Sequence, residues 1–510
     1  LASEAGLSIQ QQGGNAVDAA VAVGFALAVV HPEAGNLGGG GYMVVRMNDG
    51  RTRAIDYREA APAAAKPGLY AVESEARIGY KASAVPGTVA GLAAAHRLYG
   101  ALPWRNVLEP AYKLAQKGFP ASQRMELILA LQVPVMKPLR DSASIFLHGG
   151  DRPLKQGEIV VQRDLARTIR RLQKKGWREF YEGETARLID ADMRENSGTI
   201  LLDDLRSYKP IEYEPLRGTY RGYNVLTVPP SSSGGIALLT MLNILEKFPM
   251  PLGSEGSSVS RHLLVEAMRR AFRDRAEWAA DPAFFPIPVE KLISKDHAKQ
   301  LASTVALDRA SGLPSSPAVS SDEREGADTT HFSVVDRAGN IVSNTYTLNG
   351  FYGSQVIPRG TGVLMNDIMS GFSATAGARN EIGPGKRPVS SMTPAVLLYP
   401  DGKAFAAIGS PGSATIPNSV LQVIVNLVDY RMSLRDAIEF PRIHHQYRPD
   451  RVDVEPAALV QDVADRLRAM GHRISETPRS QGDIHAVALT EDGWRVGWSD
   501  GRRGGRARGY

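Results

Sequence analysis

The spacing of hydrophobic and polar residues divides the chain into two parts. Residues 1 to about 315 mix helical and strand-like patterns, and the almost continuous apolar run over residues 16–30 is typical of a buried helix. Because this run contains Asp18 and is shorter than the roughly 20 residues of a membrane span, we expect no transmembrane segment in the sequence. The sequence starts at Leu1 without a basic stretch or a cleavage site, so any targeting segment is expected upstream of it.

A polar stretch separates the two parts. Residues 312–328 are rich in serine, proline and acidic residues and contain almost no large apolar side chain, a composition typical of an exposed loop. The alternation that follows predicts β-strands. We find no internal repeat. The predicted strands cover residues 331–336, 341–348, 395–399 and 404–408, with a turn at residues 338–340.

Composition and charge restrict the classes of function. With 510 residues, 43% of them hydrophobic and 22% charged, the chain is a globular protein large enough for one big core or two ordinary ones. The formal net charge of +6 favours anionic small molecules, but it is spread too thinly to predict a nucleic-acid partner. The absence of cysteine excludes disulfide bonds, thiolate nucleophiles and zinc–thiolate sites.

Candidate chemistry concentrates at the border between the polar stretch and the first strand, at Asp328, Thr329, Thr330 and His331. A threonine hydroxyl is a weak nucleophile unless a base is held beside it. A free α-amino group, with a pKa of about 7.7–8.0, can be that base, and Thr329 would gain one if the chain were cut just before it. Threonine is also common in β-strands, so these four residues alone leave both a nucleophile and an ordinary strand residue open.

A longer match favours the nucleophile. Residues 329–334 (TTHFSV), 339–343 (GNIVS), 345–349 (TYTLN) and 352–353 (YG) together resemble the small-subunit signature of the γ-glutamyltranspeptidases. The resemblance covers essentially the whole chain, so the sequence is identified as a member of this family. Further matching segments are residues 13–20, 35–41, 86–88, 229–235, 387–391 and 509–510.

The resemblance implies an α+β fold of the N-terminal-nucleophile hydrolase type, a stacked αββα sandwich made as one precursor. Cleavage would give a large subunit, residues 1–328, and a small subunit, residues 329–510, which pair as a heterodimer within one intertwined domain. The hydroxyl of Thr329 would attack the carbonyl of Asp328, and the same oxygen would later attack substrate amides. Thr347 matches the family position that hydrogen-bonds the nucleophile, and neither a cofactor nor a metal is implied.

An amide-cleaving site also needs hydrogen-bond donors for the developing oxyanion. Residues 409–413 match the oxyanion loop of the family, in which the backbone N–H groups of Gly412 and Ser413 are the donors. Ser413 stands where the family usually has a second glycine. The backbone donor is retained, but we expect a strained backbone conformation there. As a bare motif this loop is only a turn, without the spacing of a nucleophile elbow.

The residues expected to bind the substrate also follow from the resemblance. Arg58 matches the family arginine that binds the α-carboxylate of glutamate, a task suited to a planar, bidentate donor. Ser390 and Ser391 match its two hydroxyl partners, and Asn349 matches a ligand of the α-ammonium group. Without the motif around it, Arg58 would be interpreted as a surface or salt-bridged arginine.

The ammonium side of this pocket departs from the family pattern. Family members place an acidic or amide side chain and then an aspartate in the segment matched by residues 366–373, whereas this chain has Ile368 and Gly371 at those positions. Of the usual ammonium ligands only Asn349 remains. Asp367 would compensate if the register shifted by one residue.

Three functions stay open at this point. The leading one is a hydrolase and transferase of γ-glutamyl amides such as glutathione, passing the acyl group to water or an amine. The second is an acylase for glutaryl, cephalosporin-type or other carboxylated amides without an α-amino group. The third is an unprocessed, non-catalytic binding protein, against which Thr329, Thr347 and Arg58 argue. By resemblance, we expect the enzyme to be periplasmic or secreted.

Other motifs indicate packing. The glycines at residues 38–41 lack the Lys-Ser/Thr of a P-loop and the spacing of a dinucleotide site. His444 and His445 are adjacent on one strand, so they point to opposite faces, and no metal site is predicted there. The arginine-rich residues 502–506 lie inside the family match and are interpreted as structural.

Overall fold

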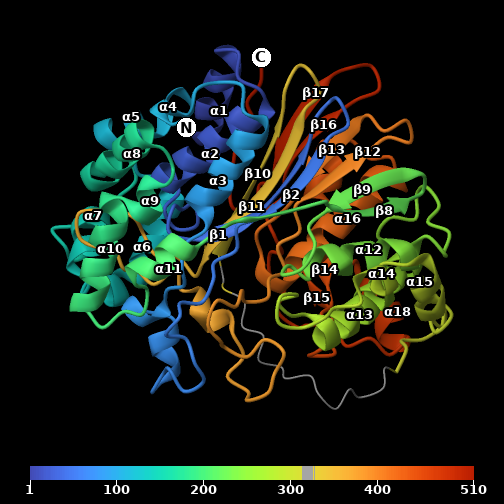
Figure 1. Cartoon of the computed structure of the whole chain (residues 1–510). Helices are drawn as coiled ribbons and strands as arrows, with labels where there is room; N and C mark the ends of the chain where they lie inside the picture. The colour runs from blue at the N-terminus through green and yellow to red at the C-terminus, as the bar shows by residue number, and fades with distance from the viewer. Residues whose placement is uncertain (313–325, 327) are drawn as a thin grey trace.

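Two β-sheets stack face to face, and a layer of helices covers the outer face of each (Figure 1). The computed structural model describes residues 1–312, 326 and 328–510, so most of the predicted loop over residues 312–328 lies outside the described residues. The four layers form the predicted αββα sandwich and confirm the α+β class.

Both sheets combine strands that precede the polar stretch with strands that follow it. All neighbours within the two sheets are antiparallel. The first sheet has the order β10 (Asp328–Val335), β11 (Ile341–Asn349), β1 (Gly40–Arg46), β2 (Thr52–Asp56) and β7 (Ile211–Tyr213). The second has the order β17 (Arg495–Ser499), β16 (His485–Leu489), β13 (Ala404–Ile408), β12 (Ala395–Leu398), β9 (Tyr223–Thr227) and β8 (Leu216–Tyr220).

The four predicted strands are confirmed as β10, β11, β12 and β13, with one informative difference. Strand β10 begins at Asp328 instead of at residue 331, so Asp328 and Thr329 belong to the sheet. Pairing of Asp328 with Asn349 and of Thr330 with Tyr346 holds the backbone on both sides of Thr329. The candidate cleavage site sits on a rigid element.

Apolar side chains from both sheets meet between them. Tyr42 and Ile341 of the first sheet pack with Leu226 and Val396 of the second, and all four are fully buried. Burying a side chain of this size contributes about 1.5–3 kcal/mol. This inner layer fixes the two sheets against each other and so fixes the positions of the strand ends that carry the candidate site.

Helix α2 (Ala16–Val30) matches the predicted buried helix and shows how it tolerates a carboxylate. Asp18 accepts hydrogen bonds from the backbone N–H groups of Asn15, in a capping box, and of Ala101. With its charge paired in this way, the helix packs among buried residues on nearly every side. No helix among the described residues is long and apolar enough to cross a membrane.

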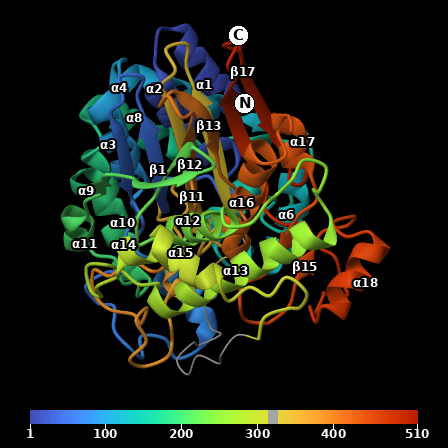
Figure 2. The same ribbon diagram turned by 90° about the vertical axis from the view of Figure 1, so that its right-hand side faces the viewer.

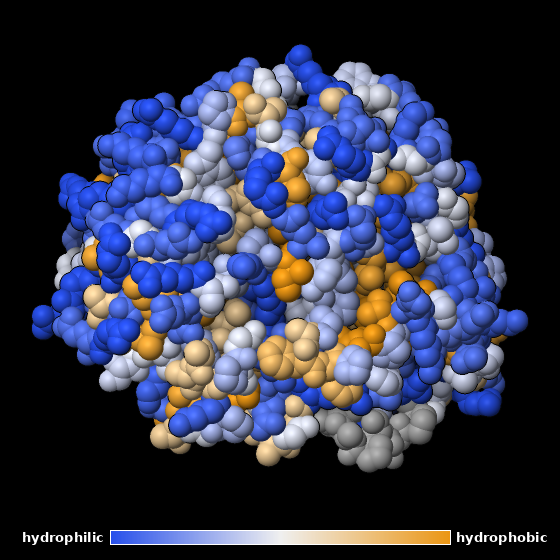
Figure 3. Space-filling view, viewed as in Figure 1, coloured by the Kyte–Doolittle hydropathy of each residue, from blue (hydrophilic) through white to orange (hydrophobic). Residues whose placement is uncertain are grey.

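Helices divide between the two outer layers (Figures 1 and 2). The surface seen in Figure 3 is largely hydrophilic, with apolar residues in small separate groups. Over the first sheet lie α1 (Ala2–Gln11), α2, α3 (Thr88–Tyr99), α4 (Trp104–Val107), α5 (Glu109–Lys117), α6 (Gln123–Met136), α7 (Arg140–Phe146), α8 (Arg163–Lys175), α9 (Glu179–Glu182), α10 (Glu184–Glu195) and α11 (Leu202–Ser207). Over the second lie α12 (Gly234–Leu245), α13 (Ser258–Trp278), α14 (Val289–Leu292), α15 (Lys295–Ala302), α16 (Ile416–Val428), α17 (Leu434–Glu439) and α18 (Gln461–Ala469).

Candidate active site

The first residues of β10 deviate from regular strand pairing. Asp328 is opposite Asn349 and Thr330 is opposite Tyr346, so the register shifts between them. Irregularities of this kind re-aim side chains and recur next to active sites. Here the shift falls on Thr329, which is buried, with 6% of its surface exposed.

The Thr329 hydroxyl lies against the carbonyl group that it is predicted to attack. Its Oγ1 is 2.8 Å from the carbonyl oxygen of Asp328 and 3.2 Å from Oγ1 of Thr347. The Thr347 hydroxyl donates to the same carbonyl oxygen at 2.6 Å and accepts a hydrogen bond from the N–H of Asn349. A donor on the Asp328 oxygen polarises the carbonyl and would stabilise negative charge that develops there.

The histidine in this motif does not point its nitrogens at Thr329. His331 is fully engaged: Nδ1 is 2.8 Å from Oγ1 of Thr345, and Nε2 is 2.9 Å from Oγ of Ser333. Burial lowers the pKa of His331 well below its ordinary value, so the ring is neutral at neutral pH. These bonds leave His331 a role in fastening β10, and the base for Thr329 has to come from elsewhere.

Asp328 lies in a buried cluster of charged side chains that the sequence did not indicate. Its Oδ1 accepts a hydrogen bond from Arg503 at 3.0 Å and lies 3.8 Å from Nη2 of Arg124. Beside them, Nδ1 of His31 is 3.1 Å from the Glu33 carboxylate. Burial raises the pKa of Asp328 to about 6, although Arg503 opposes this rise. The cluster joins four segments far apart in the sequence, and for that reason no local motif could reveal it.

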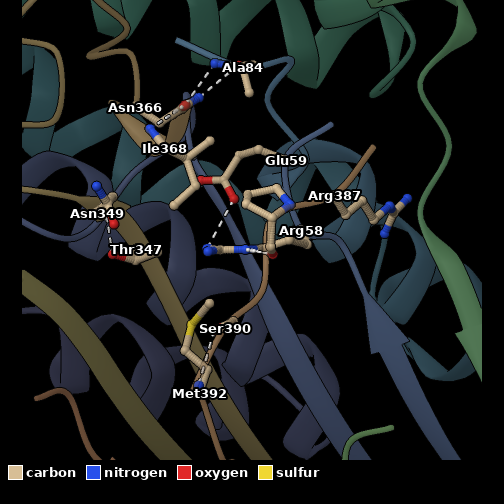
Figure 4. A network of polar contacts seen from close by, with 12 residues as sticks. Arg58, Glu59, Ala84, Thr347, Asn349, Asn366, Ile368, Arg387, Ser390 and Met392 are labelled. Carbon is tan, nitrogen blue, oxygen red and sulfur yellow. Dashed lines mark hydrogen bonds and ion pairs between the residues drawn. The ribbon is translucent and has the colours of Figure 1, made fainter. Parts of the chain in front are cut away.

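Arg58 lies against the segment that leads to Ser390 (Figure 4). It is buried, with 3% of its surface exposed, and its Nη1 is 3.3 Å from the Glu59 carboxylate. Its Nε donates a hydrogen bond to the carbonyl oxygen of Pro388 and its Nη2 to that of Val389, each at 3.3 Å. Ser391 is fully buried next in the chain. The guanidinium of Arg58 therefore lies against the two residues that precede Ser390 and Ser391.

Asn349, the predicted ligand of the substrate ammonium group, is engaged by its own chain. Its amide nitrogen donates to the carbonyl of Asp367 at 3.2 Å and to Oγ of Ser370 at 3.0 Å. Its amide oxygen, the atom that would accept from an ammonium group, is held by the N–H of Gly326 at 2.8 Å. Gly326, two residues before Asp328, thus occupies the amide oxygen of Asn349 that the ammonium group of a substrate would use.

The structure explains why Ile368 cannot bind an ammonium group. Ile368 is fully buried in an apolar cluster with Ala84, Met369 and Phe372. Asp367 lies beside it but accepts a hydrogen bond from the N–H of Gly350 at 2.7 Å, and burial raises its pKa to about 7. Asp367 is therefore near Asn349 yet only partly ionised at neutral pH.

The proposed oxyanion loop follows β13 and lies against β10. A Cβ at Gly409 would come within 2.3 Å of the His331 ring, so the loop approaches the strand that carries Thr329. Gly412 and Ser413 both have positive φ angles, +130° and +57°. For a serine such a conformation is uncommon and costs about 1 kcal/mol, in agreement with the strain expected at this position.

One group of side chains has the composition of a metal site. His262, Glu266 and His472 bring possible ligand atoms within 4.8 Å of one another. However, Glu266 forms ion pairs with Arg269 and Arg270, whose charges oppose a cation. His262 and His472 are hydrogen-bonded to each other at 2.7 Å. We interpret the group as a polar core network that sequence spacing did not suggest.

The remaining motifs behave largely as expected. A Cβ at Gly38, Gly39 or Gly41 would come within 2.1–2.4 Å of a carbonyl oxygen, so these glycines serve close backbone packing. His444 bonds to Asn418 and Gln446, whereas His445 bonds to Asp450. The structural interpretation of residues 502–506 agrees with the ion pairs of Arg502 with Glu455 and Asp500 and of Arg503 with Asp328.

The αββα sandwich is the fold of the N-terminal-nucleophile hydrolases, and Thr329 lies buried near the start of β10, the edge strand of the first sheet. Comparison with known proteins gives the family. A family model described as Gamma-glutamyltranspeptidase matches residues 2–510. The chain is 39% identical over 506 residues to the glutathione hydrolase proenzyme of Pseudomonas sp. (strain A14), covering 96% of this chain and 87% of that protein.

Acylases are similar as well. The acylase ACY 1 proenzyme of Pseudomonas sp. (strain V22) is 38% identical over 509 residues, covering 98% of this chain and 90% of that protein. The solved structure of cephalosporin acylase from Bacillus halodurans has a TM-score of 0.88 at 26% identity and covers 98% of this chain and 92% of that chain. The chain belongs to the γ-glutamyltranspeptidase family and is an enzyme with the hydrolase and transpeptidase chemistry of that family.

Proposed function

We propose that the chain is a precursor that cleaves itself between Asp328 and Thr329, and that Thr329 then acts as the nucleophile of a threonine amidohydrolase and acyltransferase. The observation that carries this proposal is the contact of the Thr329 hydroxyl with the Asp328 carbonyl, at 2.8 Å, beneath the Thr347 hydroxyl. Residues 1–328 and 329–510 would then be the large and small subunits of a heterodimer. The third possibility, an unprocessed binding protein, would not need the Thr329 and Thr347 hydroxyls on the Asp328 carbonyl.

The self-cleavage step balances without any cofactor. The Thr329 oxygen attacks the carbonyl carbon of Asp328, the C–N bond breaks, and the proton of the hydroxyl ends on the released amine. Water then hydrolyses the resulting ester, which frees the Asp328 carboxyl group and restores the Thr329 hydroxyl. The new α-amino group of Thr329 is the base that was lacking, and it activates the hydroxyl for substrate amides.

The substrates we propose are γ-glutamyl amides such as glutathione, whose acyl group passes through an ester on Thr329 to water or to an amine. Arg58, Ser390 and Ser391 would hold the α-carboxylate, and Asn349 would accept from the α-ammonium group. The backbone N–H groups of Gly412 and Ser413 would stabilise the oxyanion. The names of the relatives support this class of small-molecule substrate. A periplasmic or secreted location is part of the proposal.

A second candidate, a glutaryl or cephalosporin-type acylase, is favoured by a specific observation. Ile368 and Gly371 supply no polar side chain where the family binds the ammonium group, and Ile368 is buried among apolar residues. Placing an ammonium group there without a partner is costly, whereas a methylene group is not penalised. An acyl group without the α-amino group would therefore fit at least as well.

A panel of 4-nitroanilides with γ-glutamyl, glutaryl and butyryl acyl groups tests both candidates. We expect the two carboxylated substrates to be hydrolysed within about tenfold of each other, and both faster than butyryl, because Arg58 binds a carboxylate in each. A preference for γ-glutamyl above about a hundredfold would exclude the acylase. Hydrolysis of none of the three by cleaved protein would contradict the proposed function.

A further inference from the structure

A large cavity lies next to the candidate nucleophile, on the side of the Asp328 side chain. Its volume is about 1070 Å³, and it is lined by residues of α1, β10, the start of α6 and the C-terminal segment. At Asp328 the cavity holds two cations: Arg503, which donates to the Asp328 carboxylate at 3.0 Å, and Arg124, 3.8 Å from it. Among the described residues, the only other carboxylate beside Arg124 is that of Glu33, 3.4 Å from its Nε.

The position of the Asp328 carboxylate indicates how far from the scissile carbonyl carbon these arginines bind a carboxylate. If Thr329 attacks the Asp328 carbonyl, the first acyl group on Thr329 is Asp328 itself. Its side-chain carboxyl carbon is three bonds from the acyl carbon, the spacing of a succinyl group. A γ-glutamyl or glutaryl acyl group is one carbon longer between the same two carbons. The site therefore holds a succinyl-shaped acyl group in its first ester.

Asp328 has to leave before any substrate can enter. It is 1% exposed, and its carbonyl oxygen accepts a hydrogen bond from Thr329, which is itself 6% exposed. Cleavage makes Asp328 a chain end, free to move away. Its departure removes the carboxylate from Arg503 and leaves Arg503 and Arg124 beside the pair formed by Glu33 and His31. A partly buried cluster in which basic side chains outnumber carboxylates favours the binding of one new carboxylate.

We propose that Arg503 and Arg124 form a second carboxylate-binding site of the mature enzyme, separate from Arg58. The site takes acyl groups whose carboxylate is three bonds from the scissile carbonyl carbon, the succinyl and α-aspartyl amides. This inference rests on the proposed role of Thr329 as nucleophile. It adds a substrate class that the Arg58 pocket, matched to the longer glutamyl group, does not predict.

The test compares kcat/KM for succinyl, glutaryl and butyryl 4-nitroanilides in the mature enzyme. We expect the wild type to hydrolyse the succinyl substrate at least tenfold faster than the uncharged butyryl one. Arg503→Gln should remove this advantage and leave glutaryl hydrolysis within about twofold. Arg466→Gln, an exposed arginine of α18 outside the cavity lining, is the matched control and should change neither.

Arg503→Gln also leaves Asp328 without its hydrogen bond in the precursor, so its cleavage can be slowed. The double variant Asp328→Asn/Arg503→Gln removes both charges, and its cleaved form serves for the same comparison. If succinyl is no better than butyryl in the wild type while glutaryl is hydrolysed, the second site is refuted and the proposed function stands. If Arg503→Gln slows only substrates with a carboxylated leaving group, such as 3-carboxy-4-nitroanilides, the arginines bind the leaving group and the acyl-side proposal is wrong.

Discussion

Replacing Gly371 by aspartate should restore selectivity for γ-glutamyl substrates. Gly371 ends the short 3₁₀ helix Ile368–Gly371 and is not among the glycines with a positive φ. A Cβ there would lie 3.6 Å from Cβ of Pro388 and 3.7 Å from Cδ1 of Ile368, both ordinary contacts. The backbone N–H and carbonyl need not move, so we expect the variant to fold and to cleave itself normally.

The magnitude follows from one new interaction. A charge-assisted hydrogen bond from the substrate ammonium to a carboxylate contributes about 1.5–3 kcal/mol. That energy corresponds to roughly a ten- to hundredfold change in kcat/KM. Glutaryl substrates have no ammonium group and gain nothing, so the ratio of γ-glutamyl to glutaryl hydrolysis should rise by the whole factor.

The assay measures this ratio for the wild type, Gly371→Asp and Gly371→Asn, with 4-nitroanilide substrates. Asparagine matches the shape of aspartate without its charge, so it should produce a clearly smaller rise. An unchanged ratio in a Gly371→Asp protein that still hydrolyses the glutaryl substrate would refute the reasoning. A loss of γ-glutamyl activity in Asp367→Asn would then assign the ammonium group to Asp367, which already lies beside Asn349.

Three further outcomes are expected. Arg58→Lys keeps the charge but loses the bidentate geometry, so kcat/KM on carboxylated anilides should fall roughly ten- to hundredfold while self-cleavage persists; an unchanged value removes Arg58 from the site. In Gly412→Ala the Cβ would lie 2.5 Å from Oγ1 of Thr415, so the loop with the proposed oxyanion donors must shift and kcat should fall roughly 10²–10³-fold. Self-cleavage should be spared, because the Thr347 hydroxyl already donates to the Asp328 carbonyl. In an uncleaved Thr329→Ala background, the free energy of unfolding should fall as pH rises through about 6, because burial raises the Asp328 pKa from 3.8. Asp328→Asn should remove up to about 3 kcal/mol of that fall, as measured by urea unfolding between pH 4 and 8; an identical pH profile in both proteins would contradict it.

The sequence predicted those parts of the site that depend on local patterns. Alternating residues predicted β10 and β11. The motif predicted a hydrogen bond between Thr329 and Thr347, which lie on these neighbouring strands with their hydroxyls 3.2 Å apart. Likewise, the apolar run with Asp18 predicted α2, because a capped carboxylate at a helix start is a local feature.

The sequence could not predict contacts that the fold makes between distant segments. Arg503 and Asp328 are 175 positions apart, and nothing near either residue indicates the other. The network of His262, Glu266 and His472 has the same origin, because α13 and the segment after α18 meet only in the folded chain. The start of β10 was misplaced for a different reason: the polar composition before Thr330 indicated a loop, whereas pairing with β11 holds Asp328 in the sheet.

The central claim is that Thr329 cuts the chain before itself, and the size of the purified protein tests it most directly. By the arithmetic of about 110 Da per residue, the wild type should run as two pieces of roughly 35 and 20 kDa, with threonine at the start of the smaller one. Thr329→Ala should remain one chain of about 55.1 kDa and should have no amidase activity. Thr329→Ser retains a hydroxyl, so it should still be cleaved into two pieces. A Thr329→Ala protein that is cut between residues 328 and 329 would contradict the account.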